Sequence, residues 1–111
     1  LVDENYYQME LAHEDHINSV HNANTDFPLP DVVLSENQVL IAFNDAYKGS
    51  SGEVHFYDPV SKDNDRKVKF DLTKDNVCAV PTASLPSNYY HVRIAWTNNG
   101  KSYFHETELQ R

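Results

Sequence analysis

The stretch "LPSNYYHVRIAWTNNGKSYFHETEL" (85–109) decides the fold class. Residues 89–96 alternate between apolar and polar side chains, and a period of two indicates a β-strand with one buried face. The dipeptide Asn99-Gly100 is a strong signal for a tight hairpin turn. We therefore expect residues 102–109 to return as an antiparallel strand, so that this stretch forms a long β-hairpin.

The spacing of four residues at the start of the hairpin makes the prediction of the fold more specific. Leu85, Asn88, Tyr90 and Val92 follow the L-x-x-[GN]-x-Y-x-V rhythm of a tyrosine corner. In immunoglobulin-like domains the hydroxyl group of this tyrosine bonds back to the backbone just upstream. The alternative is a tyrosine that merely precedes a strand. The tyrosine corner favours an immunoglobulin-like sandwich.

Upstream of the hairpin the chain continues as short alternating segments separated by turns. These segments are 38–44, 53–58, 68–72 and 77–80. Strands at this spacing, with one apolar and one polar face each, indicate an antiparallel β-sandwich. The residues predicted to form its core are Val39, Ile41, Phe43, Phe56, Val68, Phe70, Val92, Ile94 and Trp96.

The N-terminal part has a different period. The segment "VDENYYQMELAHEDHINSVHNAN" (2–24) is predicted to be helical, with the regular part over residues 4–20. At 100° per residue, six of its side chains fall within a stripe about 100° wide. The stripe consists of Tyr6, Met9, His13, His16, Ile17 and Val20. Turn formers and two prolines end the helix between Asn22 and Pro30.

Charge is distributed unevenly along the 111 residues. Residues 1–47 hold nine acidic residues and no Lys or Arg, whereas residues 48–111 hold eight acidic and nine basic residues. The net charge of −8 is thus carried by the N-terminal part. Without a basic surface, the chain is not expected to bind nucleic acid. Docking on an anionic lipid surface is disfavoured for the same reason.

A metal site is the main chemical alternative for the helix. "HEDH" (13–16) places two histidines three residues apart, whereas the zinc-protease motif needs four. No third ligand is fixed by the sequence, so we expect no dedicated metal site and no cofactor. The alternative that stays open is copper binding by His13, His16 and Met9.

The strands also carry His55, His91 and His105, which would suit copper or zinc if they converged. A solvated sheet face explains them more simply. No nucleophile motif and no phosphate-binding glycine loop is present in the sequence. We therefore predict that the protein is not an enzyme.

Three stretches, in this order, resemble the FixH-like family. Residues 2–24 are similar to its "YY-x-K-E-L-A-Y-x-D-x-I" string, although Met9 stands where Lys is common. "SGEVHFYDPVSKDNDRKVKF" (51–70) resembles its "G-x-[IV]-x-F-x-R-P-S" region, with Asp58 in place of Arg. "YHVRIAWTNNGKSYFHETEL" (90–109) is similar to its closing hairpin.

This resemblance implies an inner-membrane accessory protein of a cbb-type haem–copper cytochrome c oxidase. One N-terminal span, absent from this chain, would anchor an immunoglobulin-like domain on the periplasmic side. The implied organisation is a juxtamembrane helix (1–24), a linker (25–37) and the sandwich (38–111). The stripe on the helix is the candidate surface for membrane oxidase subunits. Two other functions stay open, which are periplasmic copper handling and a generic immunoglobulin-like adhesion module.

Overall fold

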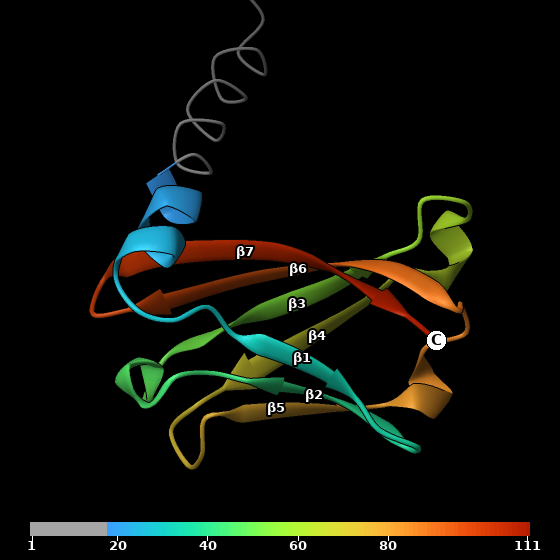
Figure 1. Cartoon of the computed structure of the whole chain (residues 1–111), viewed down its shortest axis with the longest axis horizontal. Coiled ribbons are helices and arrows are strands. Elements are labelled where there is room, and N and C mark those ends of the chain that lie inside the picture. The colour runs from blue at the N-terminus through green and yellow to red at the C-terminus, as the bar shows by residue number, and fades with distance from the viewer. Residues whose placement is uncertain (1–17) are drawn as a thin grey trace, which may run out of the picture.

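A computed structural model describes residues 18–111 as two antiparallel β-sheets with a short helix at the N-terminal side (Figure 1). The three-stranded sheet has the order β1-β2-β5, and the four-stranded sheet has the order β4-β3-β6-β7. The strands are β1 (Asp31–Leu34), β2 (Gln38–Ala42), β3 (Ser51–Tyr57), β4 (Arg66–Asp71), β5 (Val77–Pro81), β6 (Tyr89–Asn98) and β7 (Lys101–Gln110). The helices are an α-helix over 18–25 and the short 3₁₀ helices η1 (Asp45–Tyr47), η2 (Lys62–Asn64) and η3 (Thr82–Ser84).

The predicted hairpin is the longest pairing in the molecule. β6 and β7 run antiparallel from Tyr89 opposite Gln110 to Asn98 opposite Lys101. The turn places Asn99 at φ 54° and Gly100 at φ 79°, the two positive angles that a tight hairpin of this hand requires. The prediction of a mainly β, immunoglobulin-like antiparallel sandwich preceded by one helix is confirmed. Residues 4–17 of the helix predicted over 4–20 lie outside the described residues.

The tyrosine corner is present at the start of β6. The hydroxyl group of Tyr90 accepts a hydrogen bond from the backbone N–H of Ser87, at 3.1 Å. The same hydroxyl donates to the carbonyl oxygen of Asn64, at 2.7 Å. The upstream bond was expected from the spacing, while the bond to Asn64 ties the corner to the loop between β3 and β4. Tyr90 therefore fixes two separate chain segments at one end of the sandwich.

The predicted core is confirmed for seven of its nine residues, which are buried between the two sheets. The exceptions are Val68 and Phe70, which pack against the core but are only partly buried. Both lie on β4, the edge strand of its sheet, where no further strand covers them on one side. Tyr47 from η1 is fully buried as well. An alternating strand pattern cannot identify a core residue that lies in a turn.

The predicted linker contains a strand. Residues 31–34, inside the segment 25–37, form β1 and pair with β2 from Asp31 opposite Ala42 to Leu34 opposite Val39. The linker prediction missed this strand because four residues are too few to establish an alternating pattern next to two prolines. The pairing extends the smaller sheet by one edge strand.

Candidate functional site

The helix over 18–25 is attached to the beginning of β7. Figure 1 shows it beside that strand, and Asn22 Nδ2 donates a hydrogen bond to the carbonyl oxygen of Ser102, at 2.9 Å. Ala23 is completely buried and belongs to the core. Directly after the helix, Asp26 accepts hydrogen bonds from Lys101 Nζ at 2.7 Å and from the Tyr103 hydroxyl at 2.8 Å. These contacts fix the end of the helix on the β6–β7 hairpin.

The polar contacts of Asp26 change the proton affinity of two groups. The hydrogen bond from Lys101, followed by the one from Tyr103, holds the pKa of Asp26 below its usual value. Burial and then the hydrogen bond to Asp26 raise the pKa of Tyr103 to about 12. The aspartate is therefore ionised and the tyrosine neutral at physiological pH, and this pair of states suits the observed hydrogen bond.

An aromatic cluster supports this attachment from within the core. The rings of Trp96 and Tyr103 are stacked, with centroids 5.5 Å apart and planes 10° apart. The ring of Tyr47 is roughly perpendicular to both, with its centroid 5.2 Å from that of Trp96 and 5.1 Å from that of Tyr103. Aromatic pairs in these arrangements add about 0.5–1.5 kcal/mol each beyond the area that they bury. The hairpin that holds the helix is thus anchored in an aromatic part of the core.

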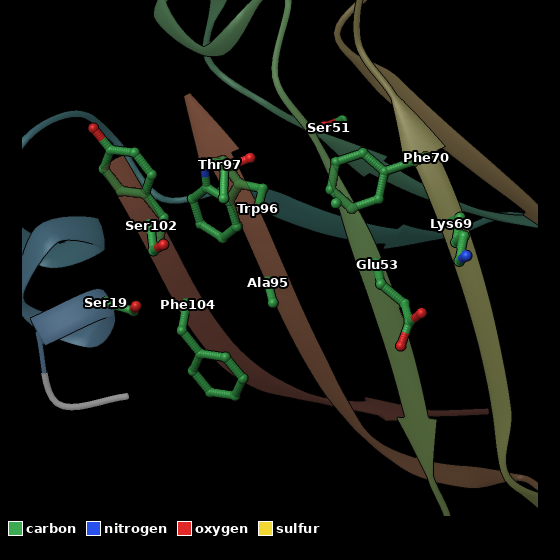
Figure 2. Close-up of a pocket in the computed structure, with 12 residues that line it drawn as sticks. Ser19, Ser51, Glu53, Lys69, Phe70, Ala95, Trp96, Thr97, Ser102 and Phe104 are labelled. Carbon is green, nitrogen blue, oxygen red and sulfur yellow. The ribbon is translucent and has the colours of Figure 1, made fainter. Parts of the chain in front are cut away.

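A groove of about 650 Å³ opens on the outer face of the four-stranded sheet, beside the helix. Figure 2 shows Ser19 and Phe104 on one side, Ala95 in the middle, and Glu53 with Lys69 on the other side. The lining is mostly apolar, and its volume lies within the range of roughly 300–1,000 Å³ that binding pockets occupy. The groove is therefore shaped to receive apolar side chains.

The groove is deepest at Ala95, which stands between Glu53 of β3 and Phe104 of β7 on the outer face of the sheet. A Cβ atom on Gly52 would collide with the carbonyl oxygen of Ala95 on the neighbouring strand. Glycine at this position of β3 therefore lets the backbone of β6 approach closely. Ala95 itself faces solvent from the centre of β6. The very small side chain of Ala95, between larger side chains on both neighbouring strands, leaves the depression that Phe104 borders.

A second, smaller hollow of about 420 Å³ lies on the other side of Phe104. Val20 and Asn24 of the helix line it together with Phe104, His105 and Glu106. Val20 is half-buried there and is the last residue of the predicted stripe. Because Phe104 lines both hollows, the helix and the groove form one continuous surface.

A family model described as FixH matches residues 1–110, nearly the whole chain. The chain belongs to the FixH family. The match includes all three stretches on which the resemblance rested. No curated protein and no solved structure gave a match.

The structure places only one residue of the predicted partner-binding stripe of this FixH-family chain. Val20 lies in the helix beside Phe104, as described above. The other five, Tyr6, Met9, His13, His16 and Ile17, lie outside the described residues. Within residues 18–111, no helix has the length and hydropathy that a membrane crossing requires.

The strand histidines of the FixH-family chain do not gather into a metal site. His55 Nε2 lies 3.2 Å from an Asp65 carboxylate oxygen, and His91 Nδ1 lies 3.8 Å from a Glu106 carboxylate oxygen. Partial burial lowers the pKa of His105. Among the residues that the structure describes, no three or more His, Cys, Asp or Glu side chains are placed to hold a metal ion.

The groove is harder to predict from the sequence than the strands are. Its walls come from the helix, β3, β4, β6 and β7, which lie far apart in the chain. The usable signal was the occurrence of Ala95, with its very small side chain, at a polar-face position between Arg93 and Thr97. A small residue there leaves a gap in an otherwise solvated face.

Proposed function

We propose that this chain is a membrane-anchored, non-enzymatic accessory protein in the assembly or stability of a cbb-type haem–copper cytochrome c oxidase. It acts by protein–protein contact with membrane subunits of the oxidase. The observation that carries the proposal is the FixH match over residues 1–110. The apolar groove on the outer face of the described domain supports a role in protein–protein contact.

The proposed location is the inner membrane, with one N-terminal span and the domain on the periplasmic side. Loops that stay in the cytoplasm carry an excess of Lys and Arg, and flanks that are exported lack them. Residues 1–47 contain neither Lys nor Arg. This composition supports a position on the exported side of a membrane.

The proposed docking element is the stripe Tyr6, Met9, His13, His16, Ile17 and Val20. Such a mixture of aromatic, thioether, imidazole and aliphatic groups packs well and tolerates partial wetting. The described end of the helix supports the proposal, because Asn22, Ala23 and Asp26 attach it to the sandwich while Val20 stays half-exposed. Internal docking and partner binding thus use different residues of this segment.

The test uses the full-length membrane protein with Met9→Ala, His13→Ala and Ile17→Ala, and Glu14→Ala as the control outside the stripe. We expect the three stripe variants to reduce co-purification with oxidase subunits and to leave the melting temperature of the domain nearly unchanged. Unchanged co-purification together with a lowered melting temperature would instead show that the stripe packs on its own sandwich.

A further inference from the structure

We propose that the chain associates with a second copy of itself by pairing β7 of one copy with β4 of the next. The two strands form the opposite edges of the four-stranded sheet, whose order is β4-β3-β6-β7. The pairing extends this sheet from one copy into the other, as exposed edge strands are able to do. The inference goes beyond the proposed function and does not depend on it.

The outward edge of β7 offers backbone hydrogen-bonding groups. The side-chain amide of Asn22 donates to the carbonyl oxygen of Ser102, which therefore points away from β6. Backbone groups of an antiparallel strand alternate in direction with a period of two, so those of Glu106 and Glu108 point away from β6 as well. Within residues 18–111, the backbone groups of these two glutamates have no hydrogen-bond partner beyond the hairpin. This part of β7 can therefore pair with a further strand.

The outward edge of β4 has the same arrangement. The alternation continues through the pairings of β6 with β3 and of β3 with β4, and it directs the backbone groups of Lys67 and Lys69 away from the sheet. The hydrogen bond from the N–H of Leu72 to the carbonyl oxygen of Ser50 agrees with this assignment, because it turns the even-numbered residues of 66–72 towards β3. Each edge thus has two successive outward positions that carry a charged side chain.

The charges at the two edges are complementary. Directly opposite residues share a face of the sheet, so Glu106, Glu108, Lys67 and Lys69 all project from the outer face. A copy displaced across the sheet presents β4 antiparallel to β7. Glu106 then lies opposite Lys69 of the second copy, and Glu108 lies opposite Lys67. Glu106 is 43% exposed although it accepts a bond from Arg93 at 2.9 Å, so its carboxylate is accessible to a second cation. Opposite charges across two strands attract each other.

The same charges disfavour symmetric pairing. Two copies of β7 would place glutamates opposite glutamates, and two copies of β4 would place lysines opposite lysines. Like charges directly opposite each other destabilise a strand pair. Charged edges protect a sheet against unspecific pairing, and they leave open the pairing with an edge of opposite charge. The contact is therefore head to tail, and it can repeat from one copy to the next.

The edges of the three-stranded sheet are less suited to pairing. Pro30, just before β1, lacks an N–H at a position whose backbone nitrogen faces outwards. Pro81 has the same effect at the end of β5. At the other end of β5, the N–H of Val77 already donates to the carboxylate of Asp75, at 3.3 Å. The four-stranded sheet thus has the edges that are better able to accept a strand.

The pairing also covers apolar side chains. Val68 and Phe70 on the inner face of β4 are only partly buried, because β4 is an edge strand. In the register described above, Thr107 of the second copy lies beside Val68, and His105 lies beside Phe70. Both apolar side chains lose contact with water in the extended sheet, which favours association.

Charge reversal tests the pairing. Two differently tagged copies of the full-length protein are expressed in one membrane, and the amount of one copy that co-purifies with the other is measured. The double variant Glu106→Lys/Glu108→Lys has two basic edges, and Lys67→Glu/Lys69→Glu has two acidic edges. We expect each double variant to lose association with itself by about fivefold or more, because two attractive pairs become repulsive. A mixture of the two should associate as strongly as wild-type copies, because opposite charges then meet at each contact.

Matched controls separate this effect from a general change in charge. Glu36→Lys and Lys74→Glu lie at exposed positions in turns away from both edges and should leave co-purification unchanged. If loss of the bond from Arg93 lowers the melting temperature, Glu108→Lys with Lys67→Glu provides the same comparison at one pair. No association between wild-type copies, equal losses from controls and edge variants, or no recovery in the mixture would overturn the proposal.

Cysteine pairs test the register. Lys69→Cys is placed in one tagged copy and Glu106→Cys in the other, and an oxidant is added. Hydrogen-bonded residues of antiparallel strands have Cα atoms about 5.5 Å apart, which is within the range of a disulfide. We expect a crosslink in the mixed pair and little between two copies of the same variant. Crosslinks mainly between identical variants, or none in the mixed pair, would refute the head-to-tail contact.

Discussion

The hydroxyl group of Tyr103 and the carboxylate of Asp26 lie 2.8 Å apart, although 77 residues separate them in the sequence. Lys101 contacts the same carboxylate from the adjoining turn. These hydrogen bonds join the end of the helix over 18–25 to the β6–β7 hairpin. They also fix the position of Val20 relative to the groove. Asp26, together with Asn22 and Ala23, thus holds the helix on the hairpin.

Asp26→Asn should reduce the loss of stability in acid. The folded pKa of Asp26 is lowered, so its ionised form stabilises the fold above the unfolded value near about 3.9. That contribution disappears as the pH falls through the folded pKa. We expect the melting temperature of the wild type to fall more between pH 7 and pH 3 than that of Asp26→Asn. Asp31→Asn, an exposed change on β1, is the control, and parallel curves for Asp26→Asn and wild type would contradict the prediction.

Tyr90→Phe should destabilise the domain by about 1–3 kcal/mol. The change leaves the N–H of Ser87 and the carbonyl oxygen of Asn64 without their partner at the tyrosine corner. In a domain of this size each kcal/mol lowers the melting temperature by roughly 4–8 °C. Tyr89→Phe, on the neighbouring half-exposed position, is the control. Equal melting temperatures for the two variants would show that the corner contributes little to stability.

Gly52→Ala should destabilise the domain, because the new methyl group meets the backbone of Ala95. Overpacking of this kind typically costs about 1–3 kcal/mol, and here a backbone atom must move. Urea unfolding of Gly52→Ala and of the exposed neighbour Ser51→Ala measures the difference. A stability equal to wild type would mean that β3 and β6 can separate locally to make room for the methyl group.

Titration with Cu(I), Cu(II) and Zn(II) should show only weak binding to residues 1–111. The histidines of the described part do not assemble a ligand set. His13 and His16, three residues apart, have no third ligand fixed by the sequence. Calorimetry provides the measurement. A stoichiometric site that survives a competing chelator, and is lost in the His13→Ala/His16→Ala double variant, would make copper handling the leading function.

Local patterns in the sequence were sufficient for most of the sandwich. The alternation around Val92 and Ile94, the Asn99-Gly100 turn and the spacing before Tyr90 each involve residues close together in the chain. Such signals depend on the pleat of a strand and on backbone angles, which neighbouring residues determine. The fold class and seven core positions therefore followed from the sequence by itself.

Only the tertiary structure determines the features of the fold and of the groove that depend on residues far apart in the chain. The short strand β1 exists because β2 offers it an edge, and Tyr47 is buried because two aromatic rings from the hairpin surround it. The groove forms only where strand pairing places Ala95 between Glu53 of β3 and Phe104 of β7. No periodicity of one segment encodes these contacts, because each depends on the register and packing between segments that the chain brings together only when it folds.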